Sequence, residues 1–267
     1  MPRSRRARLR STLFLLTLAS LAPRQAEAGR RAFLFAYDSE IVPEGDVELE
    51  QWWWSESRIP ANPDAGRPNA RPAWYWIWSA PVIGLTNHLE LSLPFQVFAT
   101  SNSTSLQTFS AELYYRLFSR EKEGGVQPLL RVSYHHAIQA RVPSSAEADL
   151  VVAFGKPNAL HVVLNAGATF SFPWPEAQPP LAQFIRPSVG GGFSFPLDSS
   201  AEFRLSTEVL AEFQDSTSSS FPRYLVGGAL SWTRGRIWVT AGTMVGLTGL
   251  SSATPPFIPR LLWAVAL

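Results

Sequence analysis

Residues 201–213, AEFRLSTEVLAEF, alternate apolar and polar side chains over their whole length. Phe203 and Val209 share one face of an extended chain, whereas Arg204 and Glu208 share the other. A period of two predicts a β-strand with two different faces. The segment is longer than the usual 5 or 6 residues of a strand and is long enough for a tilted bilayer crossing, which needs about 9–11 residues.

The same alternation recurs along the chain, and no window carries about 18 uninterrupted apolar residues, so no transmembrane helix is expected. The pattern predicts twelve strands, at 46–54, 74–83, 88–98, 108–118, 127–136, 149–155, 161–172, 185–195, 201–213, 222–232, 236–245 and 260–267.

The predicted connections alternate in length. The long ones, rich in Pro, Ser, Ala and Asn, are 55–73, 99–107, 137–148, 173–184, 214–221 and 246–259. The intervening turns are mostly short, at 84–87, 119–126, 156–160, 196–200 and 233–235. Long loops at one end, short turns at the other and an even strand count are typical of outer-membrane barrels. The expected fold is therefore all-β, a transmembrane antiparallel up-and-down β-barrel of about 12 strands, over residues 46–267.

The first residues have the features of an export signal. Five arginines between Arg3 and Arg10 precede an apolar run, 13–22, and an Ala-Glu-Ala cleavage motif ends at Ala28. Residues 1–28 are therefore predicted to be a cleaved secretory signal peptide of a Gram-negative bacterium. Residues 29–45 contain an alternating Phe33, Phe35 and Tyr37, but an odd extra strand would spoil the loop asymmetry. We expect them to be a periplasmic lead-in or a partial plug.

Composition excludes several classes of function. The chain has no cysteine, which removes disulfide scaffolds, zinc fingers, iron–sulfur sites and thiol nucleophiles. Its formal charge is +2, from 23 basic and 21 acidic residues. Cleavage after Ala28 would remove six arginines and one glutamate, leaving 17 basic and 20 acidic residues and a charge of −3. The mature chain thus has no basic footprint for nucleic acid.

Charged side chains on the polar faces of the predicted strands should point into the lumen, where water or a charged partner must meet them. They are expected either to set solute selectivity or to brace the wall as Glu–Arg pairs. These candidates are Glu48, Glu50, Glu90, Glu112, Arg116, Arg131, His135, Glu202, Arg204, Glu208 and Glu212.

Aromatic residues gather at the ends of the predicted strands, which suggests two interfacial girdles. The alternative is the aromatic core of a soluble β-protein. The tryptophans assigned to the girdles are Trp52, Trp53, Trp54, Trp74, Trp76, Trp78, Trp174, Trp232 and Trp238.

The sequence gives little support for a catalytic site or a metal site. His135 and His136 are adjacent in a strand and point to opposite faces, so they cannot close on one ion. His88 and His161 each begin a predicted strand, where an exposed rim histidine is expected. A lipid-modifying enzyme acting through His136 is the enzymatic alternative. We expect no catalytic residue, no metal and no cofactor.

Residues 84–95, GLTNHLELSLPF, resemble a turn and strand of Gram-negative outer-membrane barrels of the transporter-like type, similar to the meta-pathway phenol-degradation outer-membrane family. Residues 112–117, ELYYRL, and 129–131, LLR, are similar to the next hairpin of that group, and 43–50, PEGDVELE, to its opening strand. The resemblance implies a passive transporter-like barrel. The chain departs from this pattern in ending on Leu267 instead of an aromatic residue.

The sequence thus predicts a porin-like channel for small solutes in the cell outer membrane. Its expected partners are outer-membrane lipid, the barrel-assembly machinery and a small-molecule solute, and no nucleic acid. A structural or adhesive barrel with a closed lumen is the alternative from a different class.

Overall fold

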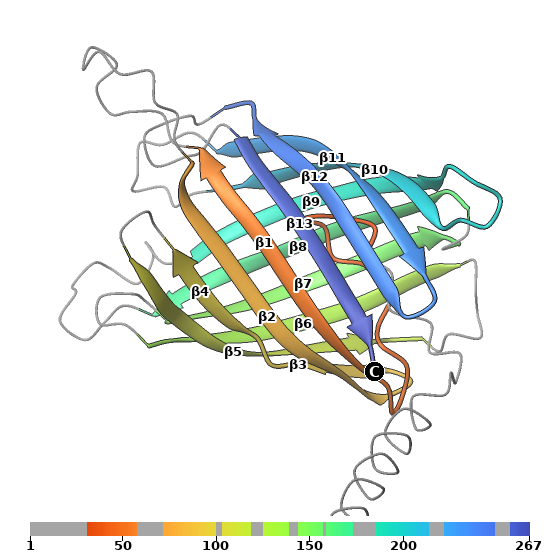
Figure 1. Cartoon of the computed structure of the whole chain (residues 1–267), viewed down its shortest axis with the longest axis horizontal. Coiled ribbons are helices and arrows are strands. Elements are labelled where there is room, and N and C mark those ends of the chain that lie inside the picture. The colour runs from red at the N-terminus through yellow and green to blue at the C-terminus, as the bar shows by residue number, and fades with distance from the viewer. Residues whose placement is uncertain are drawn as a thin grey trace, which may run out of the picture.

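The structure, a computed structural model, describes residues 31–57, 72–99, 103–118, 125–138, 144–156, 159–172, 185–213, 222–248 and 257–267. Its regular elements are all β-strands (Figure 1). Within these ranges, no helix has the length and hydropathy needed to span a bilayer.

The strands form one antiparallel sheet that closes on itself, because β1 pairs with both β2 and β13. Closure removes the exposed edges that an open sheet would present to lipid. The strands are β1 (Val47–Ser57), β2 (Pro72–Thr86), β3 (Leu89–Ser92), β4 (Phe95–Ala99), β5 (Thr104–Arg116), β6 (Val126–Ala137), β7 (Ser144–Gly155), β8 (His161–Phe172), β9 (Ile185–Pro196), β10 (Phe203–Glu212), β11 (Arg223–Arg234), β12 (Ile237–Gly246) and β13 (Phe257–Ala266).

β3 and β4 together occupy a single strand position in the barrel wall. Both pair with β2 on one side and with β5 on the other, and only Leu93 and Pro94 separate them. Proline has no N–H to donate to the ladder, so the strand is interrupted there. The barrel therefore has twelve strands, and the predicted count and fold class are confirmed.

The predicted strand positions agree with the structure to within a few residues, with β7 the largest difference at the start of a strand. β7 begins at Ser144, five residues before the predicted start at residue 149. Its first outward residues are Ala146 and Ala148, whose small side chains make the alternation weak. The large connections predicted at one end lie mostly outside the described residues.

The distribution of side chains is inverted relative to a soluble protein. On β10, Leu205 and Val209 are 40% and 58% exposed, whereas Arg204 and Glu208 are 3% and 1% exposed. Apolar side chains therefore cover the outer face, and charged side chains face the lumen. This is the arrangement required of a barrel surrounded by lipid.

Residues 31–45, which we call the lumen segment, run inside the barrel (Figure 1, red to orange before β1). Four of their apolar side chains pack into separate clusters against inward-facing wall residues: Phe33 beside Val163, Leu34 beside Leu262, Ile41 beside Leu129 and Val42 beside Val82. Burying each side chain of this size stabilises the segment by about 1.5–3 kcal/mol.

The lumen segment leaves the lumen past Gly84. Gly45 N–H donates to the Gly84 carbonyl at 2.8 Å, and Gly84 N–H donates to the Asp46 carbonyl at 3.0 Å. A β-carbon on Gly84 would overlap the Pro43 carbonyl oxygen, so only glycine allows this close crossing.

Replacing Gly84 with alanine should therefore lower the free energy of unfolding by about 1–3 kcal/mol, the usual cost of overpacking. The measurement is urea unfolding of the refolded barrel, followed by heat-modifiable gel mobility. Gly125→Ala is the control, because a β-carbon there meets no atom within 4 Å. Equal midpoints for the two variants would contradict the close crossing.

Candidate functional site

The candidate site is the filled lumen, and its central contact is one wall carboxylate. Glu208 of β10 accepts three successive backbone N–H groups of the lumen segment. Leu34 donates to Oε1 at 2.6 Å, and Phe35 and Ala36 donate to Oε2 at 2.8 Å each. Hydrogen bonds to an ionised acceptor are about twice as strong as neutral ones. Glu208 thus fixes the middle of the segment.

Other wall side chains bond to the remaining backbone of the segment. The Asn165 amide of β8 accepts from Tyr37 N–H at 2.7 Å and donates to the Tyr37 carbonyl at 3.1 Å. Arg116 donates to the Ser39 carbonyl through Nε at 3.0 Å and Nη2 at 2.9 Å. Because buried backbone groups need partners, these contacts replace the sheet ladder that the segment lacks.

Each of the three alternating aromatic rings of the segment lies beside a basic side chain of the wall. The centroid of Phe33 lies 6.3 Å from that of His161, and the guanidinium of Arg260 lies 3.9 Å from the Phe35 centroid. The guanidinium of Arg131 lies 4.1 Å from the Tyr37 centroid. Burial raises the pKa of the Tyr37 phenol, which stays neutral in this position. Cation–π attraction adds to the segment's packing.

Arg131 is the hub of a charge cluster. Its Nη1 lies 2.8 Å from Glu147 Oε2 and 2.7 Å from Asp149 Oδ2, and its Nη2 lies 3.2 Å from Glu112 Oε2. The Tyr114 hydroxyl also donates to Glu112 at 2.8 Å. A single guanidinium thus pairs with three carboxylates, and His135 Nε2 lies 3.7 Å from Glu147 Oε2.

A second cluster involves the segment's own Arg31. Its Nε lies 2.9 Å from Glu50 Oε1, and its Nη2 lies 3.6 Å from Glu90 Oε1. The guanidinium also lies 5.4 Å from the Trp52 ring centroid and 5.5 Å from that of Tyr114. Two carboxylates and two aromatic rings therefore surround this cation.

The eleven charged residues proposed from the sequence all lie in the described part of the chain. Buried ones are Glu48, Glu50, Glu90, Glu112, Arg116, Arg131, Arg204 and Glu208, with exposed fractions of 1–5%. Partly exposed ones are His135 and Glu212, on strands, and Glu202, in the turn before β10. Eight of the eleven are thus withdrawn from water into the barrel.

Several residues of the site were not predicted. Glu147 lies in the missed start of β7, and Asp149 is the first residue of the predicted strand but was not proposed as a site residue. His161, expected at an exposed rim, is 4% exposed and lies 2.8 Å from Asp38. Arg260 could have been predicted from the sequence. It lies two and four residues before Leu262 and Ala264, so all three side chains are on the inward face of β13. The inward position of Asp38 could not be predicted in this way, because the lumen segment has no regular strand pairing.

Five of the proposed girdle tryptophans face the lumen, and their assignment to the lipid interface is wrong. Trp52 and Trp78 stack with centroids 4.4 Å apart, Trp54 and Trp76 stack at 5.9 Å, and Trp238 is 1% exposed and donates to Glu48 at 3.2 Å. The reason is parity: Trp52 and Trp54 lie two and four residues after Glu50, on the same face.

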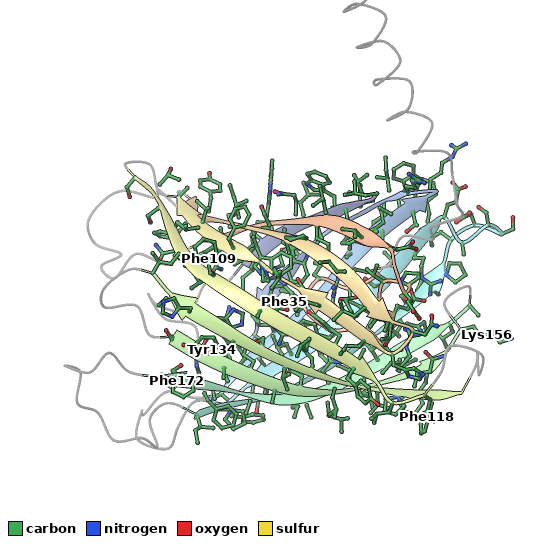
Figure 2. The ribbon with its side chains drawn as sticks, turned by 90° about the horizontal axis from the view of Figure 1, so that it is seen from below. Phe35, Phe109, Phe118, Tyr134, Lys156 and Phe172 are labelled. Carbon is green, nitrogen blue, oxygen red and sulfur yellow. The ribbon has the colours of Figure 1, made fainter. Side chains whose placement is uncertain are left out.

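The remaining tryptophan assignments have different outcomes. Trp53 is 48% exposed on the outer face, and Trp232 is partly exposed. The side chain of Trp74 and the whole of Trp174 lie outside what the structure describes. Other aromatic side chains occupy the outer surface towards its two ends, with Phe109, Tyr134 and Phe172 near one end and Phe118 near the other (Figure 2).

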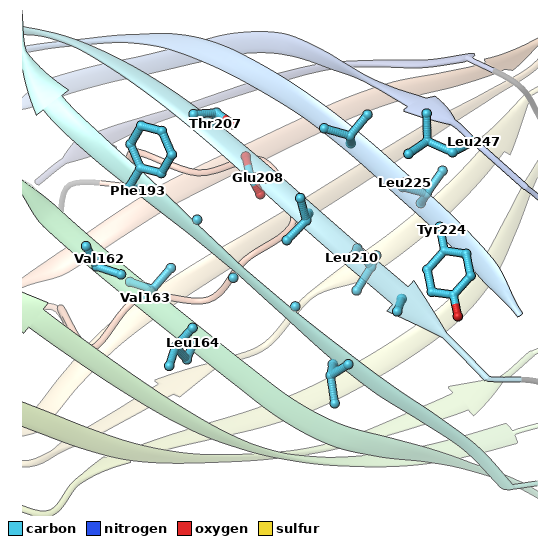
Figure 3. A pocket seen from close by; sticks show the side chains of 17 residues that line it. Val162, Val163, Leu164, Phe193, Thr207, Glu208, Leu210, Tyr224, Leu225 and Leu247 are labelled. Carbon is cyan, nitrogen blue, oxygen red and sulfur yellow. The ribbon is translucent and has the colours of Figure 1, made fainter.

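The outer face also carries an apolar hollow of about 660 Å³ beside Gly190, Gly191 and Gly192 (Figure 3). Val209 and Phe193, 58% and 45% exposed, lie at this outer surface. A lipid-facing hollow of this composition has few polar groups to orient a solute. Among the described residues, the clusters of charged and hydrogen-bonding side chains described above lie in the lumen instead.

Comparison with protein-family models and with curated proteins found no match. Among solved structures, the chain is similar to the COG4313 outer membrane channel from Pseudomonas putida F1, with 13% identity and a TM-score of 0.55, over 88% of this chain and 100% of that one. It is also similar to the KdgM porin, with 9% identity and a TM-score of 0.54, over 82% and 98% of the two chains. The fold is therefore that of outer-membrane β-barrel channels.

Glu208→Gln tests the anchoring of the lumen segment. Loss of the charged acceptor should cost about 1.5–3 kcal/mol and raise amide hydrogen exchange at Leu34, Phe35 and Ala36 by about ten- to a hundredfold. Glu212→Gln is the matched control on the same strand, since Glu212 pairs with Arg223 at 3.1 Å and has no hydrogen bond with the segment among the contacts described here. Unchanged exchange in Glu208→Gln would contradict the anchoring role.

The placement of the tryptophans is tested by quenching with bromine-labelled lipid chains. Trp53→Phe should reduce the amount of tryptophan emission that the lipid quenches, whereas Trp52→Phe and Trp238→Phe should leave that amount unchanged, because those two rings lie inside the barrel. Quenching lost equally in all three variants would contradict the inward placement.

Proposed function

We propose that this barrel is a passive, porin-like channel for small solutes in the outer membrane, narrowed by its own lumen segment. The observation that carries the proposal is the charged interior. Glu208, Arg131 and Arg260 point inward within a wall whose outer face is apolar. Charged side chains along the inside of a membrane barrel bias the passage of ions and polar solutes.

The width of the barrel supports a channel. About 8 strands give an interior that side chains fill, and 16 to 18 strands leave an open aqueous pore. Twelve strands enclose an intermediate space, and here the lumen segment occupies part of it. Solute passage would follow the space beside the segment or the space that its displacement opens.

A second candidate, a structural or adhesive barrel with a closed lumen, is favoured by the contacts of the same segment. Residues 31–42 bond to β1, β5, β8, β10 and β13, so they cross the lumen from wall to wall. A segment that never moves would close the barrel permanently.

The proposal extends to the setting of the protein. Residues 1–28 act as the export signal, and the barrel-assembly machinery inserts residues 46–267 among outer-membrane lipids. The chain acts without catalysis and without nucleic acid. Its relation to the meta-pathway phenol-degradation outer-membrane family, suggested by the resemblance at residues 43–136, belongs to this proposal as well.

Planar-bilayer recordings test the channel. Purified wild-type barrel should give small discrete conductance steps, and deletion of residues 31–42 should raise the step size severalfold by clearing the lumen. Gly125→Ala, at a position where an added β-carbon meets no atom within 4 Å, is the control and should leave the step size unchanged. Silence of both the wild type and the 31–42 deletion, in barrels that remain heat-modifiable, would favour the closed structural barrel.

A further inference from the structure

The cage around Arg31 is built mainly by the wall. Glu50 and Trp52 come from β1, Glu90 from β3 and Tyr114 from β5, and only the guanidinium comes from the lumen segment. Glu50 and Glu90 are 2% and 1% exposed, and Tyr114 is 1% exposed. The cation is thus the part of this site that the lumen segment supplies, and the wall supplies a desolvated receptor for it.

The wall side of the cage has further contacts that orient it. Trp52 Nε1 donates to Glu50 Oε2 at 3.1 Å, which leaves Oε1 directed at Arg31. Glu90 Oε2 accepts from the Val42 N–H at 2.6 Å, which leaves Oε1 as the atom nearest Arg31. The receptor geometry is therefore held by Trp52 of the wall and by Val42 of the lumen segment, not by the cation it binds.

We propose that this cage is a binding site for an organic cation, a guanidinium or alkylammonium solute, and that Arg31 occupies it as a built-in substitute. The inference rests on the proposed channel function and adds its solute class. Carboxylates pair with guanidinium through charge-assisted hydrogen bonds, and aromatic faces attract the same cation. The site offers both kinds of contact to one group.

When Arg31 leaves, the two buried carboxylates lose their cation, and either a proton or a cationic solute can neutralise them. Two carboxylates buried this deeply are costly to leave without a cation, and breaking a buried pair by removing one partner costs about 3–5 kcal/mol. A cationic solute that enters as the segment moves would remove that cost. The solute therefore competes with Arg31 for the same atoms.

The composition of the cage favours an organic cation over a metal ion. Calcium takes 6–8 oxygen ligands, and magnesium demands six in an octahedron. The cage presents two carboxylates and two aromatic rings, and the residues that the structure describes contain no group of three or more His, Cys, Asp or Glu side chains able to hold a metal. Aromatic rings fit a guanidinium plane or an alkylammonium group.

Arg31→Ala empties the cage and leaves its wall intact. The probe is arginine amide, and the readout is isothermal titration calorimetry of the refolded full barrel in detergent. The variant should bind arginine amide about tenfold or more tightly than the wild type, because the competing intramolecular cation is gone. Nα-acetylcitrulline amide, which has a neutral ureido group and no free amine, is the ligand control and should not bind. Arg31→Lys should bind arginine amide as weakly as the wild type does, because its ammonium group still occupies the cage.

Arg31→Ala with Glu50→Gln and Glu90→Gln is the decisive variant. It should lose the binding gained by Arg31→Ala, and its heat-modifiable band should show that the barrel is folded. Equal binding by this variant and by Arg31→Ala, or binding of Nα-acetylcitrulline amide, would overturn the site.

Bilayer recordings separate this inference from the channel proposal. If Arg31→Ala conducts and arginine amide blocks it, both proposals gain support. Conductance without block or binding overturns the cation site and leaves the channel standing. Binding in a barrel that never conducts, including after deletion of residues 31–42, overturns the channel and leaves a cation receptor.

Discussion

Backbone N–H and C=O groups placed inside a membrane barrel must find partners there, and the wall of this protein supplies them to the lumen segment. Glu208, Asn165 and Arg116 bond to the segment's peptide groups as neighbouring strands would bond to a strand. Without these side chains, residues 31–42 would carry unpaired polar groups through the lumen. The position of the lumen segment depends on these hydrogen bonds from wall side chains to its backbone. The space left in the lumen and the placement of Arg31 depend on them in turn.

The fold could be predicted from the sequence because lipid imposes alternation residue by residue. Residues 201–213 show it clearly, and β7 was shortened in the prediction because Ala146 and Ala148 weaken the apolar face. The same parity rule places Glu50 on the polar face and would have placed Trp52 there too. Aromatic residues at a strand end were instead assigned to the lipid interface, although the lumen of a filled barrel also buries them.

The lumen segment could be predicted only in outline. Phe33, Phe35 and Tyr37 alternate in sequence, but their partners His161, Arg260 and Arg131 lie more than 90 positions away along the chain. No local pattern links such residues, because strand closure in space brings them together. The sequence therefore indicated a lead-in or a partial plug, whereas the contacts that hold the segment became visible only with the barrel closed around it.

The closure of β1 on β13 has a consequence for the order of assembly. The lumen segment directly precedes β1, and the seam beside it can form only after the last strand has been made. The hydrogen bond from Arg260 to the Leu34 carbonyl spans 226 positions, so this contact of the segment forms only when β13 is in place. Because the segment crosses the interior, it must be inside before the seam seals or be threaded in afterwards from an open end. Completing the wall and filling the interior are therefore coupled, because pairing of β13 with β1 both seals the barrel and encloses the segment.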